Sequence, residues 1–166
     1  TTTPQGIAAG VSMRKSDAFM GNQLILVDAV QDPGNLGTII RTADAAGMDG
    51  IILGKGTVDL YNDKVWRSTQ GSIFHIPIYE ADLKLKIEEL KKSDFEIWAT
   101  ALENSSRYNE LPIPEKIAII LGNEGAGVDS ALLQAADQRV NIPIYGKAES
   151  LNVAIAAAIL MYQIKS

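Results

Sequence analysis

Short apolar segments of strand length alternate with amphipathic segments of helix length through most of this chain. Leu24–Val27 and Ile51–Leu53 are apolar at every position. Such uninterrupted runs are typical of strands in parallel sheets, because helices cover both faces of those sheets. The alternation therefore predicts an α/β fold, with a mostly parallel sheet and flanking helices.

The remaining elements follow from periodicity and from the residues that begin or end a helix. An amphipathic helix is predicted around Leu83, Ile87 and Leu90, and Asn62 is a predicted N-cap. His75 falls in a predicted strand and is expected to be structural or exposed rather than catalytic. The other helices are predicted over residues 36–46, 63–69, 128–136 and 151–164, and the other strands over 73–79, 95–99, 116–121 and 139–142.

The chain of 166 residues is predicted to hold one folded domain, residues 21–166. Residues 1–20 lack an amphipathic period and contain Pro4, Gly6 and Gly10, so they are predicted to be an extended lead-in or linker. No apolar run is long enough to span a bilayer, and no signal-peptide pattern is present. A cytoplasmic protein without a membrane partner is expected.

Composition excludes several kinds of site. The chain has no cysteine and a single histidine, so thiolate metal sites, redox pairs and two-histidine sites are excluded, and we expect no metal. The net charge of −5 predicts weak nucleic-acid binding by this chain alone. A local basic patch stays open, and its candidates are Arg41, Lys64, Arg67, Arg107 and Lys147.

The last predicted helix, residues 151–164, has almost no polar face. A helix that is apolar all round must be buried all round. We predict that a second copy of the chain covers this helix, which makes the protein a homodimer. The alternative is a central helix buried within one chain.

Three segments at predicted strand ends or helix starts carry polar side chains, two of them together with glycine, where open α/β sheets keep their ligand sites. The first, residues 35–41, reads NLGTIIR. Gly34 and Gly37 would let a ligand approach the backbone, and Arg41 could bind a phosphate or carboxylate with two hydrogen bonds. The alternative for Arg41 is an ion pair with Asp44, three residues further on.

The second and third segments are LGNEGAG at residues 121–127 and SLNVA at residues 150–154. Amides of the glycine-rich loop could line a nucleoside, or the loop could be a plain turn before a helix capped by Asp129 or Ser130. Ser150 and Asn152 could be site residues or simple N-caps. Dinucleotide-binding, P-loop and hydrolase motifs are missing.

In this order and spacing, the three segments resemble the motifs of the SpoU/TrmH family of RNA ribose 2′-O-methyltransferases. The resemblance implies the SPOUT type of α/β fold, with a C-terminal trefoil knot. It implies S-adenosylmethionine as cofactor and methyl transfer to a ribose 2′-OH of structured RNA. Ribosomal RNA is favoured as substrate; transfer RNA, or a non-catalytic module that binds cofactor or RNA, is the alternative.

The resemblance also assigns roles to residues. It implies a catalytic group made of Asn35, Arg41, Glu124, Ser150 and Asn152. We expect Arg41 to clamp phosphate and stabilise an alkoxide rather than act as a base, because a guanidinium stays protonated. Ala154 stands where many members have serine. The implied cofactor-binding residues are Thr100, Ala101, Leu121, Gly122, Asn123, Gly127, Ile142, Ile144, Gly146, Leu151 and Ala154.

Overall fold

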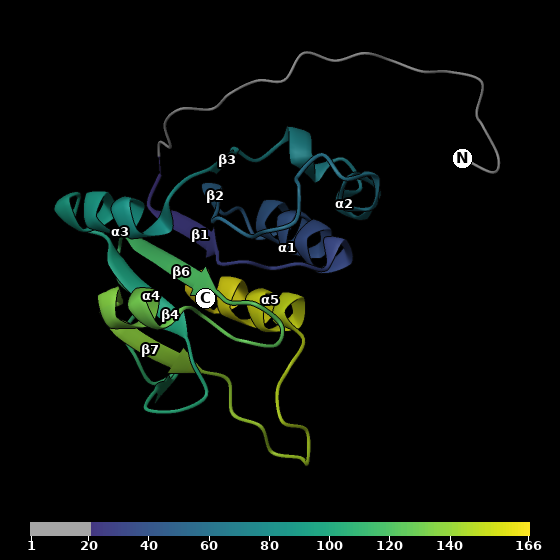
Figure 1. Cartoon of the computed structure of the whole chain (residues 1–166). Coiled ribbons are helices and arrows are strands. Elements are labelled where there is room, and N and C mark those ends of the chain that lie inside the picture. The colour runs from purple at the N-terminus through teal and green to yellow at the C-terminus, as the bar shows by residue number, and fades with distance from the viewer. Residues whose placement is uncertain (1–20) are drawn as a thin grey trace, which may run out of the picture.

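A computed structural model describes residues 21–166, in which seven strands form one sheet (Figure 1). The strand order is β3-β2-β1-β6-β4-β7-β5, and every pairing is parallel. The predicted parallel α/β fold is therefore confirmed. The strands are β1 Gln23–Val27, β2 Gly50–Leu53, β3 Ile78–Glu80, β4 Glu96–Thr100, β5 Ser106–Arg107, β6 Ile117–Leu121 and β7 Gln138–Asn141.

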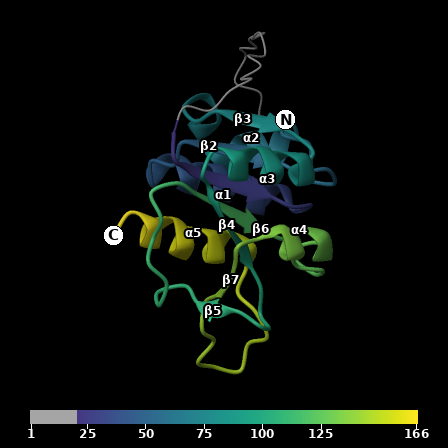
Figure 2. The same ribbon diagram turned by 90° about the vertical axis from the view of Figure 1, so that its left-hand side faces the viewer.

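Helices cover both faces of the sheet, because successive side chains of the apolar strands point to opposite faces. Ile25 and Val27 of β1 pack in one core with residues of α1 and α5, whereas Leu24 and Leu26 pack in a second core with residues of α3 and α4. Figure 2 shows α4 and α5 on opposite sides of the sheet. The helices are α1 Pro33–Ala45, α2 Asp63–Thr69, α3 Leu83–Lys92, α4 Ser130–Ala135 and α5 Val153–Ile164.

Asx side chains begin the helices. Asn62 accepts a hydrogen bond from the Lys64 N–H at 2.9 Å and caps α2 as predicted. Asp129, one of the two predicted candidates, caps α4. Asp32 caps α1 by accepting from the Asn35 N–H at 2.8 Å, with Pro33 in the first turn. Each of these caps satisfies a backbone donor that the first helical turn leaves free.

The final helix α5 returns from β7 to lie beside α1. At one end the Asn152 side chain donates to Asn35 Oδ1 at 2.9 Å, and at the other end Lys165 Nζ donates to the Gly47 carbonyl at 2.7 Å. The two helices thus run in the same direction, and residues 142–152 cross from the far part of the sheet to reach α1. This path is consistent with the predicted trefoil knot, which stays a prediction.

Only one face of α5 is buried within the chain. Ala157, Leu160 and Met161 enter the core, but Ile155 is 52% exposed and Tyr162 is 55% exposed. The alternative of a helix buried entirely within one chain is therefore wrong.

The predicted strand over residues 73–79 is wrong in its first half. Ser72–Phe74 forms a 3₁₀ turn, and only Ile78–Glu80 pairs with β2. Gly71 has a φ of 95°, which starts the turn, and Pro77 has no N–H to give to a ladder. His75 is exposed, which agrees with one of the two predicted alternatives. Its Nδ1 lies 3.0 Å from Asp44 Oδ2.

The predicted lead-in, residues 1–20, lies outside the described residues. Within residues 21–166, no helix combines the length and apolar character needed to cross a bilayer. The same stretch contains no group of three or more His, Asp or Glu side chains that could hold a metal ion.

Candidate active site

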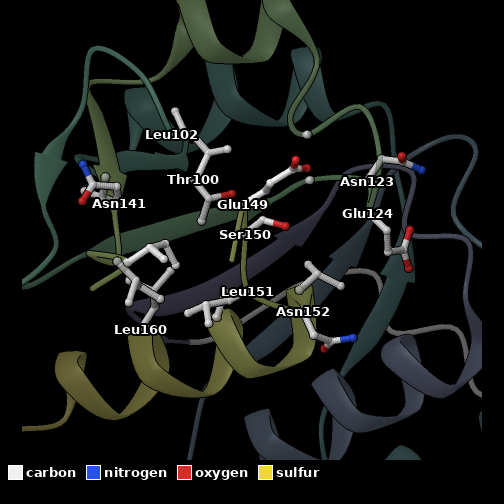
Figure 3. Close-up of a pocket in the computed structure, with 18 of the residues that line it drawn as sticks. Thr100, Leu102, Asn123, Glu124, Asn141, Glu149, Ser150, Leu151, Asn152 and Leu160 are labelled. Carbon is white, nitrogen blue, oxygen red and sulfur yellow. The ribbon is translucent and has the colours of Figure 1, made fainter. Parts of the chain in front are cut away.

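A cavity of about 560 Å³ opens at the edge of the sheet where the parallel strands end (Figure 3). Its walls come from the end of β4, the loop after β6, the segment after β7 and the first turns of α5. Carboxyl ends of parallel strands are where open α/β sheets bind ligands. The lining residues are Thr100, Ala101, Leu102, Gly122, Asn123, Glu124, Gly125, Gly127, Val140, Asn141, Ile142, Ile144, Glu149, Ser150, Leu151, Asn152, Val153, Ala156 and Leu160.

The loop after β6 is shaped by Asn123. Its Oδ1 accepts from the N–H groups of Gly125 and Ala126 at 2.9 and 3.0 Å, and its Nδ2 donates to the Ala29 carbonyl at 2.8 Å. Gly122 must lack a side chain, since a Cβ there would collide with the backbone of Gly127. The glycine-rich loop is therefore a folded turn tied to the chain after β1.

The Glu124 carboxylate joins this loop to the start of α1. Oε1 accepts from Asn35 Nδ2 at 2.9 Å and from the Asp32 N–H at 3.1 Å, and Oε2 accepts from the Gln31 N–H at 3.2 Å. Burial raises the pKa of Glu124, but the hydrogen bonds from Asn35 and from backbone N–H groups outweigh it. The pKa lies below its usual value, so the side chain is a fixed negative charge at neutral pH.

Asn35 extends this connection to the third motif. Its Oδ1 accepts from Asn152 Nδ2 at 2.9 Å, and Asn152 Oδ1 accepts from the Ala154 N–H at 2.9 Å. Asn152 is therefore the N-cap of α5 and also a member of the hydrogen-bonded chain that links it to Glu124. Ser150 lines the cavity and does not cap the helix.

Arg41 lies apart from these four residues. It is on the exposed side of α1, does not line the cavity, and makes no hydrogen bond or ion pair within residues 21–166. The alternative pair with Asp44 is wrong, because that carboxylate faces His75. Of the catalytic residues implied by the resemblance, one chain thus brings together Asn35, Glu124, Ser150 and Asn152.

Gly37 does not face a ligand, contrary to expectation. A Cβ at this position would collide with Ser68 and lie 2.9 Å from the Val65 carbonyl of α2. The glycine serves close packing of α1 on α2.

Eight of the eleven implied cofactor-binding residues line the cavity. The other three lie elsewhere: Leu121 and Ala154 are buried in the core, and Gly146 is exposed on the segment after β7, outside the lining. The eight are Thr100, Ala101, Gly122, Asn123, Gly127, Ile142, Ile144 and Leu151.

Glu149 and Asn141 also line the cavity, and the sequence reasoning missed both. Glu149 directly precedes the Ser150 motif, so its place beside a recognised segment was the available signal. Asn141 ends a strand that was expected to continue one residue further.

The basic side chains considered for a patch are mostly paired with acids. Lys64 lies 3.5 Å from Asp32, Arg67 lies 3.8 Å from Asp63, and Arg107 lies 3.6 Å from Glu110. Arg41 and Lys147 form no ion pair within residues 21–166.

Comparison with known proteins points to one family. A sequence model described as the SpoU rRNA Methylase family matches residues 22–162. The chain is 53% identical over 165 residues to the 23S rRNA (guanosine(2553)-2′-O)-methyltransferase RlmP of Bacillus subtilis (strain 168), and the match covers 99% of this chain and 66% of that protein.

Solved structures agree. An rRNA methyltransferase from Sinorhizobium meliloti superimposes with a TM-score of 0.84 at 37% identity, covering 92% of this chain and 61% of that one. An AdoMet-bound rRNA methyltransferase from Sinorhizobium meliloti gives a TM-score of 0.83 at 40% identity, covering 87% of this chain and 56% of that one. The chain thus spans between 56% and 66% of the length of these relatives.

Proposed function

Because this chain belongs to the SpoU rRNA methylase family, we propose that it transfers a methyl group from S-adenosylmethionine to a ribose 2′-OH of ribosomal RNA. The observation that carries the proposal is the cavity at whose rim Glu124, Asn35 and Asn152 link the three motifs by hydrogen bonds. The name of the Bacillus subtilis relative supports 23S ribosomal RNA over the transfer RNA alternative, and an enzyme over a non-catalytic module.

The cavity suits S-adenosylmethionine in size and chemistry. Its volume of about 560 Å³ lies within the usual range for small-molecule sites. Ile142, Ile144 and Leu151 offer apolar surface, and the acids Glu124 and Glu149 suit a cationic molecule. We assign cofactor binding to the eight implied residues that line the cavity. When bound, the cofactor supplies a methyl group that its sulfonium makes electrophilic.

The chain's own residues must then orient the ribose and allow its 2′-OH proton to be removed. We assign Asn35, Glu124, Ser150 and Asn152 to orienting the reacting groups. Arg41 clamps an RNA phosphate and stabilises the negative charge that develops on the 2′-oxygen, since a guanidinium with a pKa above about 12 does not accept protons. The hydroxyl proton goes to a carboxylate of the site or to the RNA phosphate.

We further propose that the working form is a homodimer. The exposed side of α5 carries Ile155 and Tyr162, and covering it with a second copy would bury this apolar surface. Arg41 lies outside the cavity of its own chain. A second copy that packs against α5 would complete the site by supplying its Arg41.

The test is calorimetric titration with S-adenosylmethionine, followed by a methyl-transfer assay on 23S ribosomal RNA. Ala156→Phe should abolish cofactor binding, because Ala156 lines the cavity and a phenyl ring would fill part of it. Ala131→Phe is the matched control, as Ala131 is also half-buried but lies on α4 outside the lining. A folded parent protein that binds no S-adenosylmethionine would contradict the proposal.

A further inference from the structure

The polar side chains that line the cavity fall into two groups. Five of them form hydrogen bonds within the protein: Asn123, Glu124 and Asn152 as described above, Thr100 to the Ile120 carbonyl at 3.1 Å, and Asn141 to Ser105 Oγ at 2.8 Å. Glu149 and Ser150 make no hydrogen bond or ion pair with any of residues 21–166. These two are the polar side chains of the lining whose hydrogen-bonding groups are all unused within the described residues.

The charge of the cavity comes from acids alone. Glu124 and Glu149 line it, and no Lys, Arg or His among the described residues does. Three N–H donors already surround Glu124, whereas the Glu149 carboxylate is unpaired. In the view of Figure 3, Glu149 lies between Thr100 and Asn123 and next to Ser150. An unpaired carboxylate in such a cavity favours a cationic ligand over a neutral one.

We propose that Glu149 recognises the sulfonium charge of S-adenosylmethionine and so makes the site prefer the methyl donor to its demethylated product. This inference rests on the proposed function. It places Glu149 at the reacting end of the cofactor because Ser150, the next residue, belongs to the group assigned to the reacting atoms.

The preference for the charged methyl donor follows the change of charge in the reaction. The 2′-oxygen forms a bond to the methyl carbon, the C–S bond breaks, and its electron pair stays on sulfur. The sulfonium thereby becomes a neutral thioether, and the 2′-OH proton leaves to a base. The attraction to Glu149 is present before transfer and lost after it, so the carboxylate selects the donor and favours release of the product.

The experiment compares three ligands by calorimetry on the parent protein and on Glu149→Gln. S-adenosylmethionine and sinefungin both carry a positive charge at the reacting position, whereas S-adenosylhomocysteine is neutral there. The variant should bind the first two about fivefold more weakly and the third with little change. Glu149→Asp should keep part of the preference, because it keeps the charge.

The control is Glu88→Gln, which removes one negative charge from α3, where the side chain is exposed and forms no hydrogen bond or ion pair with residues 21–166. Circular dichroism checks that each variant is folded. An equal loss for all three ligands would assign Glu149 to the amino group that they share and would overturn the inference, as would no loss at all. A folded parent that does not bind S-adenosylmethionine would instead contradict the proposed function, and the inference would fall with it.

Discussion

At the scale of single residues, Glu124 connects the most parts of the site, and its protonation should affect stability. Its pKa is depressed in the folded protein, so its contribution is complete above the unfolded value of about 4.3 and is lost as the pH falls through the lower folded value. Glu124→Gln should lower the free energy of unfolding at pH 7 by about 1 kcal/mol, because an amide N–H₂ would replace an oxygen that accepts from N–H donors. Denaturant unfolding of both proteins between about pH 3 and pH 7, which spans the titration of a glutamate, measures the difference in their free energies of unfolding.

The direction in which this stability difference changes with pH tests the depressed pKa of Glu124 directly. The gap between parent and variant should be widest above about pH 5 and should shrink as the pH falls. Glu88→Gln, the exposed change on α3, should show no such gap. A gap that widened toward acid pH would contradict the depressed pKa.

Arg41 allows a separate test of catalysis. Arg41→Lys keeps a positive charge but loses the planar pair of donors that grips a phosphate. Methyl transfer should fall about 100-fold, in line with the loss of one donor to a developing oxyanion. S-adenosylmethionine should bind with unchanged affinity, because Arg41 is assigned to the RNA phosphate and the reacting oxygen rather than to the cofactor. Arg67→Lys on α2 is the matched control. Unimpaired transfer by Arg41→Lys would refute the phosphate clamp.

The sequence predicted three segments for the site, and the two later ones, residues 121–127 and 150–154, contribute side chains to the cavity lining. Asn35 of the first segment is joined to them by hydrogen bonds with Glu124 and Asn152, and the roles of these residues stay a prediction. Asn35 and Asn152 are 117 positions apart, so no local spacing could show that they share a hydrogen bond. Glu149 could not be singled out for a related reason, since only the folded structure shows that it lines the cavity and that most other polar side chains of the lining are paired whereas it is not.

At the scale of elements, the packing of α1 on α2 depends on Gly37. Gly37→Ala should raise helix propensity by up to about 1 kcal/mol, yet its Cβ would meet Ser68 and the Val65 carbonyl and push the helices apart. We expect a net loss of about 1–3 kcal/mol in the free energy of unfolding, measured by denaturant titration. Thr38→Ala, at the next and exposed position of α1, should change stability little. A Gly37→Ala protein as stable as the parent would show that the contact is not restrictive.

Elements with several turns or several apolar positions were predictable, and short or interrupted ones were not. The spacing of Leu83, Ile87 and Leu90 placed α3 correctly, since all three are buried. Ile73, Ile76 and Ile78 suggested one strand, but Gly71 and Pro77 divide that stretch into a turn and a short strand. β5, with only two residues, carries no periodic signal at all.

At the scale of the whole molecule, the exposed side of α5 leads to a prediction about assembly. Ile155→Glu puts a charge where the proposed partner would pack and should convert a dimer into monomers, as measured by sedimentation velocity. Leu85→Glu makes the same change at an exposed leucine of α3 and should leave the dimer intact. A parent protein that sediments as a monomer would contradict the proposed dimer.

If a second copy supplies Arg41, two inactive variants should restore activity when they share a dimer. Ala156→Phe blocks the cavity of its own chain but keeps Arg41. Arg41→Lys keeps an open cavity but lacks the arginine. A mixed dimer then has one site with both defects and one site with neither, so mixing the two proteins should recover methyl transfer. Adding Ile155→Glu to both variants should abolish that recovery, because the chains could no longer pair. Mixing without recovery, while mixed dimers are seen to form, would mean that each chain uses its own Arg41.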